Sequence, residues 1–252
     1  MMNIALIGCG NIACMLHHCI EEVNFVAVFD RHIERAEAVA GQLDAVPTDD
    51  FKTFLTYDFD VVIEAASVEA VRDYSYDLLS KGSDLIVLSA GALADNAYRR
   101  KLEVKALNCG RRLHVPSGAV FGLDNAGIGK VGGLTKVTMR MVKPPRSLHV
   151  ESDVKQCLFR GRAFECIKHY PKNANSAVSL SLAAGIDAEV EIWADPQCTT
   201  IRHEIDMEGA FGSVSIRINN LPSPHNPSTS YLAVLSLCAL LRSMKQPITV
   251  GS

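Results

Sequence analysis

The residues best suited to chemistry lie near the N-terminus, where Gly8, Gly10 and Ala13 share one short segment. The first glycine allows a tight turn, and the second lets the backbone approach a pyrophosphate because no Cβ intervenes. Ala13 is small enough for a helix to pack closely on a strand. Free N–H groups at the start of that helix attract phosphate. The motif predicts a dinucleotide-binding turn with contacts from Gly8, Gly10, Asn11 and Ile12; a plain structural turn is the alternative.

An acidic residue stands where such a motif needs one. Asp30 follows the next apolar segment, about twenty residues beyond Gly10. Its carboxylate can accept hydrogen bonds from the ribose hydroxyls of adenosine and repels a 2′-phosphate. The adjoining Arg31 can pair with such a phosphate. We therefore predict NAD as the cofactor, with NADP use left open by Arg31.

The elements around this motif alternate between short apolar strands and helices. Continuous apolar strands indicate a parallel sheet, and the alternation indicates a doubly wound, Rossmann-type α/β fold. We predict a dinucleotide-binding domain over residues 1–115, with strands at 3–7, 25–29, 60–66 and 85–89 and helices at 12–22, 33–43, 68–80 and 95–108.

Small residues follow two later strands of this predicted sheet. Ligands of such sheets bind outside the carboxyl ends of the strands, so small residues there leave room for ribose and nicotinamide. Tight strand–helix turns explain the same residues equally well. The predicted cofactor contacts are Ala65, Ala66 and Ser67 after one strand and Ser89, Ala90 and Gly91 after the next.

The pattern changes after Pro116 to segments that alternate apolar and polar residues, typical of an antiparallel sheet with one solvated face. We predict a second, α+β domain over 116–225 with a mainly antiparallel sheet and a hairpin turn at 209–212. A C-terminal helix of about 226–246 is expected to pack back onto the first domain. The strands are expected at 135–142, 189–194, 199–207 and 213–219, with a helix at 174–184.

Composition excludes several functional classes. The net charge is −3 and no run of like charges occurs, which argues against nucleic-acid and anionic-membrane partners. No apolar stretch is long enough for a membrane span or a signal peptide, so we expect a cytoplasmic protein. The 8 cysteines are scattered, which indicates thiols in a reducing compartment rather than a disulfide framework, and no metal site is expected. Cys9 and Cys14 flank the glycine turn, either as inert packing or as a point of oxidation.

Several segments together closely resemble the L-aspartate dehydrogenase family. The matching segments are spread in consistent order over nearly the whole chain: 8–13 (GCGNIA), 64–67 (EAAS), 84–95, 117–119 (SGA), 171–175 (PKNAN), 201–205 (IRHEI) and 226–230 (NPSTS). The resemblance implies NAD(P)-dependent oxidative deamination of L-aspartate to iminoaspartate, which hydrolyses to oxaloacetate and ammonia. It also implies a homodimer paired mainly through the sheet of the second domain, and a product that can feed NAD biosynthesis.

The resemblance also implies site residues. His203 takes the family's catalytic position, and Ala119 and an asparagine of PKNAN, either Asn173 or Asn175, take its NAD-contacting positions. The alternation of apolar and polar residues along 199–207 independently places His203 on the apolar face of its strand. A lone histidine on such a face is more often a hydrogen-bonded core residue. A neutral imidazole can take the ammonium proton of the substrate or activate the water that attacks the imine.

The two carboxylates of aspartate require cations or N–H donors. Lys172 is the predicted anchor, although a solvated lysine is equally compatible with the sequence. Ser117, Ser228 and Thr229 are predicted hydrogen-bond donors, and 226–228 can instead begin the last helix. Four glycines, at 127, 129, 132 and 133, weaken any helix after Leu123.

Two other functions fit parts of the sequence. One is a related NAD(P)-dependent reductase or dehydrogenase with another small acidic substrate. The other is a non-catalytic NAD-binding sensor, which would bind NAD tightly without turnover.

Overall fold

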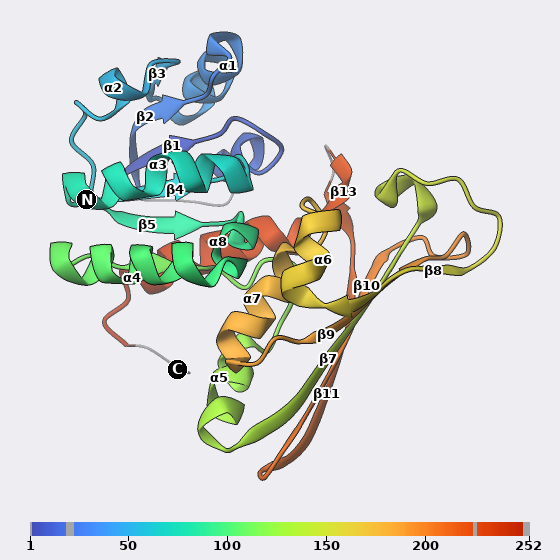
Figure 1. The fold of residues 1–252 in the computed structure, drawn as a ribbon. Helices are drawn as coiled ribbons and strands as arrows, with labels where there is room; N and C mark the ends of the chain where they lie inside the picture. Colours follow the sequence, from blue (N-terminus) through green and yellow to red (C-terminus); the bar gives the residue numbers. More distant parts are fainter. Residues whose placement is uncertain (1, 19–22, 224–225, 249–252) are drawn as a thin grey trace. The chain divides into compact units, whose positions relative to one another are not determined.

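The chain forms two compact units in the computed structural model, which describes residues 2–18, 23–223 and 226–248 (Figure 1). The first unit comprises the residues up to Pro116 together with Leu240–Arg242, and the other described residues form the second. No helix in the described ranges combines the length and apolar character needed to cross a membrane.

The first unit contains a six-stranded parallel sheet in the order β3-β2-β1-β4-β5-β6. The order reverses beside β1, which creates the crevice where such sheets bind ligands. The predicted doubly wound arrangement is therefore confirmed. The strands are β1 (Asn3–Ile7), β2 (Asn24–Phe29), β3 (Val46–Thr48), β4 (Val61–Glu64), β5 (Asp84–Val87) and β6 (Leu113–His114).

Side-chain caps begin three helices of this unit, and in one of them Asp50 accepts a hydrogen bond from the Thr53 N–H. Ser67 accepts a hydrogen bond from the Ala70 N–H, and Asp95 accepts from the Ala97 and Tyr98 N–H groups. Such caps satisfy amides that have no partner within the helix. The helices are α1 (Ile33–Leu43), α2 (Phe51–Phe54), α3 (Val68–Lys81) and α4 (Asn96–Cys109), with 3₁₀ helices η1 (Ala13–His18) and η2 (Ala90–Ala94).

The helix predicted over 12–22 is a 3₁₀ helix over Ala13–His18; residues 19–22 lie outside the described residues. The Met15 N–H donates to the carbonyl of Ile12, three residues earlier, at 3.1 Å. Apolar residues three positions apart fit three residues per turn as well as an α-helix. The spacing therefore predicted a helix without fixing its type.

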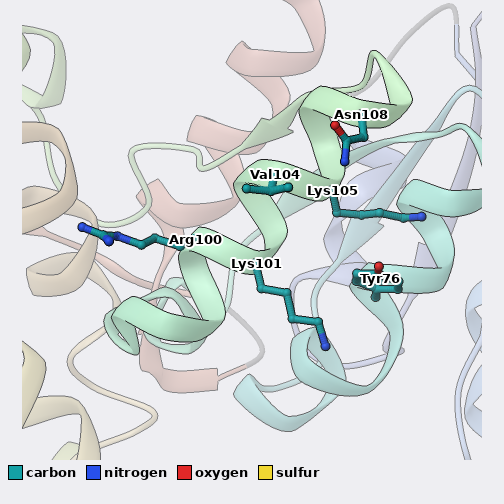
Figure 2. Close-up of a pocket in the computed structure, with 6 residues that line it drawn as sticks. All are labelled: Tyr76, Arg100, Lys101, Val104, Lys105 and Asn108. Carbon is teal, nitrogen blue, oxygen red and sulfur yellow. The ribbon is translucent and has the colours of Figure 1, made fainter.

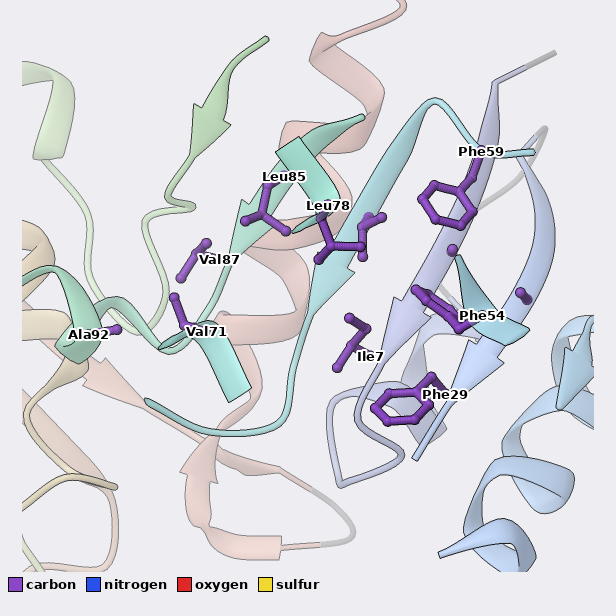
Figure 3. Packing of buried hydrophobic residues seen from close by; sticks show 12 residues of the cluster. Ile7, Phe29, Phe54, Phe59, Val71, Leu78, Leu85, Val87 and Ala92 are labelled. Carbon is purple, nitrogen blue, oxygen red and sulfur yellow. The ribbon is translucent and has the colours of Figure 1, made fainter. Parts of the chain in front are cut away.

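Buried aliphatic side chains, with Phe29, Phe54 and Phe59 among them, fill the core between this sheet and its helices (Figure 3). Phe29 lies edge-on to Tyr74, with ring centroids 5.3 Å apart, and also contacts Phe54. Edge-to-face pairs contribute about 0.5–1.5 kcal/mol beyond the burial of their area. Because Phe29 is the last residue of β2, this packing fixes the strand end from which Asp30 projects.

The second unit contains a five-stranded sheet in the order β11-β10-β7-β9-β8. Only the β7–β9 pair is parallel, which confirms the mainly antiparallel prediction. Three helices cover one face of the sheet (Figure 1). Charged side chains, among them Arg140, Glu191 and Glu204, line the other face. The strands are β7 (Leu134–Lys143), β8 (Gln156–Arg162), β9 (Glu189–Ala194), β10 (Ile201–Gly209) and β11 (Gly212–Asn220); the helices are α5 (Leu123–Val131), α6 (Ala163–His169) and α7 (Asn175–Ala184), with η3 (Pro145–Leu148) after β7.

The sequence predicts a hairpin turn at 209–212, and its four glycines after Leu123 weaken any helix there. The hairpin is confirmed, because Gly209 pairs with Gly212 across a two-residue turn. The glycine-rich segment, in contrast, forms helix α5. A Cβ on Gly129 would lie 3.2 Å from Leu134 and 3.3 Å from Phe211, so glycine here allows the helix to pack closely against the hairpin.

The C-terminal helix predicted over about 226–246 begins later than expected. Residues Asn226–Ser230 form strand β13, which pairs with β12 (Pro222–Ser223), and α8 covers Tyr231–Ser243. The Ser230 Oγ accepts a hydrogen bond from the Leu232 N–H. Ser230 therefore caps the helix, and the preceding residues pair as a strand instead of forming its first turn.

Candidate active site

The glycine turn after β1 is shaped by its contact with the loop after β4. Gly8 has φ +95°, and a Cβ there would lie 2.6 Å from the Cβ of Ala66 and 2.7 Å from its backbone nitrogen. Both the backbone conformation and the contact require glycine. The two loops therefore meet across neighbouring strands at the carboxyl edge of the sheet.

Gly10 differs from Gly8 because nothing in the protein fills the space where its Cβ would stand. The nearest atom to that position is the Ala65 carbonyl oxygen at 4.0 Å, and Gly10 is exposed. Open space over the backbone is what close approach of a phosphate needs. Asn11 and Ile12 continue this loop to η1, so the turn fits a dinucleotide pyrophosphate.

Asp30 lies at the end of β2, beside the same turn. Its two oxygens accept hydrogen bonds from the N–H groups of Cys9, at 2.9 Å, and His32, at 3.0 Å. Each carboxylate oxygen has a second lone pair, so ribose hydroxyls can still be bound. Cys9 itself is buried, and Arg31 is exposed.

A buried carboxylate that the sequence analysis missed joins the two later loops. Glu64, 2% exposed, accepts hydrogen bonds from the backbone of Ala66, Ser67 and Ser89 and from the Ser89 hydroxyl. Burial raises the pKa of Glu64, and the four donors oppose that rise. Ala90 and Gly91 follow within buried η2. The available signal was a lone acid at the end of an otherwise apolar strand.

We expect Glu64→Gln to lower the thermal midpoint of unfolding. A glutamine amide replaces one acceptor with an N–H₂ group that faces N–H donors, and a buried donor without a partner costs about 1–3 kcal/mol. In a chain of this length, each kcal/mol shifts the midpoint by about 2–4 °C. Calorimetry of Glu64→Gln against Glu69→Gln, on the exposed start of α3, tests this; equal midpoints for the two variants would contradict it.

The second unit brings His203 and Ala119 together. His203 lies in β10 with Met141 and Ile218 as cross-strand neighbours, on the predicted buried face. Its Nδ1 lies 3.0 Å from the Ala119 carbonyl oxygen, which also accepts from Asn220 Nδ2 at 2.8 Å. The Asn220 Nδ2 donor lies farther from the same Nδ1, at 3.3 Å. A carbonyl only accepts hydrogen bonds, so the shorter contact assigns the proton to Nδ1 and leaves the lone pair on Nε2. Burial, followed by nearby Lys143, lowers the pKa of His203 to about 4, so the ring is neutral at physiological pH.

Lys143 is a second functional candidate that the sequence analysis did not identify. It is the last residue of β7, and its side chain is buried. Its Nζ donates to Asn173 Oδ1 at 2.6 Å. Burial lowers the pKa of Lys143 to about 8. Lys143, Asn173, His203 and Ala119 therefore form a polar cluster within one unit.

The other predicted residues occupy more open positions. Lys172 is exposed, whereas Ser117 is half-buried. Asn175 begins α7, and its Nδ2 donates to the Pro171 carbonyl at 3.3 Å. Thr229 lies in β13; the side chain of Ser228 lies outside the described residues. Of the two candidate asparagines, it is Asn173 whose side chain joins the polar cluster.

A surface hollow between α3 and α4 contains none of the predicted site residues (Figure 2). The Nζ atoms of Lys101 and Lys105 lie 5.1 and 4.6 Å from the centre of the Tyr76 ring. Cation–π attraction explains why two lysines gather at one aromatic ring. This hollow is therefore separate from the strand ends that carry the candidate cofactor site.

Comparison with known proteins identifies the family. Residues 124–244 match the family described as "Aspartate dehydrogenase, C-terminal", and residues 6–116 match "Homoserine dehydrogenase, NAD binding domain", which supports a pyridine nucleotide cofactor. The L-aspartate dehydrogenase of Methanospirillum hungatei is 42% identical, with 100% of both chains covered. That of Methanothermobacter thermautotrophicus is 39% identical, covering 100% of this chain and 99% of the relative. The crystal structure of aspartate dehydrogenase from Thermotoga maritima superposes with a TM-score of 0.85 at 30% identity, with both chains fully covered. The chain belongs to the L-aspartate dehydrogenase family.

Proposed function

We propose that this protein catalyses the NAD-dependent oxidative deamination of L-aspartate to iminoaspartate, which water converts to oxaloacetate and ammonia. The observation that carries the proposal is the buried His203 imidazole, whose Nδ1–H is held by the Ala119 carbonyl while Nε2 keeps its lone pair. The full-length relatives named L-aspartate dehydrogenase support the same activity.

His203 acts on the substrate amine. Its Nε2 accepts a proton from the ammonium group, and the freed lone pair then forms the C=N bond as hydride leaves Cα. The nicotinamide, when bound, supplies the hydride acceptor. His203 then releases this proton to solvent and accepts one from the water that attacks the imine carbon. Return of that proton to the amine nitrogen allows the C–N bond to break and releases ammonia. The Ala119 carbonyl stabilises the protonated ring through the Nδ1–H bond.

The proposed cofactor contacts lie at four strand ends of the first unit. The glycine turn holds the pyrophosphate, Asp30 holds the adenosine ribose, and the loops after β4 and β5 border the nicotinamide half. Ala119 and one of Asn173 and Asn175 are proposed to complete these contacts, as the family resemblance implies.

Asp30→Asn is expected to shift the preference, expressed as the kcat/KM ratio for NAD over NADP, by at least about tenfold toward NADP. The substitution removes the charge that repels a 2′-phosphate but keeps one oxygen for the Cys9 N–H. A hydrogen bond to a charged group contributes about 1.5–3 kcal/mol. Adding Arg31→Ala should remove the gain for NADP, because the guanidinium pairs with the phosphate. An unchanged ratio in Asp30→Asn contradicts the ribose contact.

The activity is tested by NADH formation at 340 nm with L-aspartate and NAD at mildly alkaline pH. Turnover with L-aspartate above that with a panel of small acids and amino acids supports the proposal. Preference for another acid would instead identify a related dehydrogenase. Tight NAD binding without turnover on any member would identify a sensor.

We also propose a homodimer paired through the open face of the second unit's sheet. Residues of opposite charge lie side by side on this face. Glu191 forms ion pairs with Arg140 and Arg160, both at 2.9 Å. The residues Glu204 and Arg217 extend this pattern onto β10 and β11. Sedimentation should give twice the chain mass of 27.3 kDa. Reversing both charges with Arg160→Glu and Arg217→Glu should yield monomers; dimers that persist in the double variant would place the interface elsewhere.

The proposed setting is the cytoplasm, with iminoaspartate passed to NAD biosynthesis. Growth of a strain that lacks its own iminoaspartate source, with and without this gene, tests the pathway. Growth that still depends on added pyridine precursor would assign the enzyme to aspartate breakdown instead.

A further inference from the structure

Lys143 is a buried cation for which the described part of the chain offers no acidic partner. Its side chain is 5% exposed, and none of the ion pairs among the described residues includes it. The nearby acid Asp195, whose N–H donates to the Lys143 carbonyl, has its carboxylate paired with Lys155 at 3.4 Å. Burying an ammonium without an anion costs several kcal/mol, and an apolar residue of similar volume is commonly more stable.

The groups around Lys143 are neutral. Asn173 supplies an amide oxygen at 2.6 Å, and His203 is neutral. Burial raises the pKa of the Cys166 thiol to about 12, so this group carries no charge either. An ammonium has three N–H donors, and Asn173 engages one. The packing of the second unit therefore does not explain the charge, whereas an anionic ligand would.

The position of Lys143 connects it to the proposed catalytic base. Met141 lies directly across from His203 in the β7–β10 pair, and Lys143 follows two residues later on the same face of β7. Lys143 is also close enough to His203 to affect its protonation. The alternative cation Lys172 is exposed. Lys143 is therefore the buried positive group beside the base.

We propose that the Lys143 ammonium binds a carboxylate of the substrate and that Asn173 positions it for this contact. The inference rests on the proposed function, since L-aspartate has an α-carboxylate and a side-chain carboxylate. Either carboxylate supplies the anion that the buried ammonium lacks. Binding there brings the substrate amine to the His203 side of the cluster.

Lys143→Met is expected to raise the KM for L-aspartate about 10–100-fold, the range for loss of charge-assisted hydrogen bonds, with a smaller change in kcat. The affinity for succinate, which has two carboxylates and no amine, should fall by a similar factor in calorimetric titrations of the NAD-bound protein. The affinity for NAD should stay within about twofold. Lys168→Met, an exposed lysine of α6, is the matched control and should match the wild type.

Lys143→Gln is the second variant, because glutamine removes the charge but keeps an N–H donor, on a side chain one atom shorter. Inhibition by L-2-aminobutyrate, which has only the α-carboxylate, shows which of the two carboxylates of L-aspartate Lys143 binds. If its inhibition constant rises with the KM for L-aspartate, Lys143 binds the α-carboxylate; if it stays constant, Lys143 binds the side-chain carboxylate.

An unchanged KM and unchanged succinate affinity in either variant overturn the inference. A fall in kcat alone also overturns it, because that result assigns Lys143 to proton transfer. The proposed function can fail separately. If the wild type binds succinate through Lys143 but does not oxidise L-aspartate, the carboxylate site stands and the assignment of L-aspartate as substrate is wrong.

Discussion

Replacing His203 with alanine should lower kcat for L-aspartate oxidation by about 10²–10⁴-fold, the usual contribution of a general base. The affinity for NAD should change little, because Ala119 keeps the hydrogen bond from Asn220 when the imidazole is removed. Stopped-flow measurement of NADH formation, together with NAD titration, separates the chemical step from cofactor binding. The exposed His169→Ala in α6 is the control and should retain wild-type rates. Wild-type kcat in His203→Ala would contradict the role of base.

The same histidine should make folding sensitive to acid. The pKa of His203 is lowered from 6.5 to about 4 in the folded protein, so below pH 6.5 the unfolded chain takes up a proton that the folded chain refuses. Stability should therefore fall as pH drops from about 6.5 to about 4, by about 3 kcal/mol, and this loss should level off below pH 4. Denaturant titrations at a series of pH values give the free energy of unfolding. Its dependence on pH should differ between wild type and His203→Gln only between about pH 6.5 and about pH 4.

Gly10→Ala should lower NAD affinity by at least about 100-fold while leaving the thermal midpoint within about 2 °C of wild type. A Cβ there meets no protein atom closer than 4.0 Å, and the backbone is outside the left-handed region. The same Cβ occupies the space that a pyrophosphate needs, and loss of close backbone contacts removes several hydrogen bonds to a charged group, each contributing about 1.5–3 kcal/mol.

Two further glycine variants provide the comparison. Gly8→Ala should lose both NAD affinity and stability, because its Cβ would overlap Ala66 and φ is +95°. Gly41→Ala, in the last turn of α1 with nothing within 4 Å, should keep NAD affinity and gain up to about 1 kcal/mol of stability. Calorimetric titration and thermal unfolding of all three variants make the test; normal NAD binding by Gly10→Ala would remove the phosphate assignment.

Periodicity in the sequence predicted most of the fold because the main elements are long and regular. The strand 189–194 was predicted to the residue, and alternation placed His203 on the buried face of β10. The sequence Gln156–Arg162 escaped prediction because a register shift between Cys157 and Phe159 breaks its alternation. Short β3 and α2 escaped because three or four residues carry no measurable period.

The polar cluster of the second unit was only partly predictable. His203 and Asn173 stand in segments that resemble a family, whereas Lys143 ends a strand before two prolines and looks like a solvated terminus. The hydrogen-bond partner of its buried ammonium is Asn173, 30 positions away along the chain. Glu64 was missed for a similar reason, since its partners include Ser89 on another strand end. Contacts between distant segments decide which polar residues are buried, and no local pattern reports them.

The hydrogen bond between the Cys9 N–H and Asp30 also determines how the phosphate turn responds to oxidants. It holds Cys9 beside a carboxylate, and burial, followed by Asp30, raises the pKa of the Cys9 thiol to about 12. Peroxide and disulfides react with thiolates, and at neutral pH this thiol is almost wholly protonated. Alkylating and oxidising reagents should therefore modify the exposed Cys157 first. The turn can carry a cysteine without making the enzyme redox-sensitive, because burial, reinforced by the acid beside it, keeps the thiol protonated.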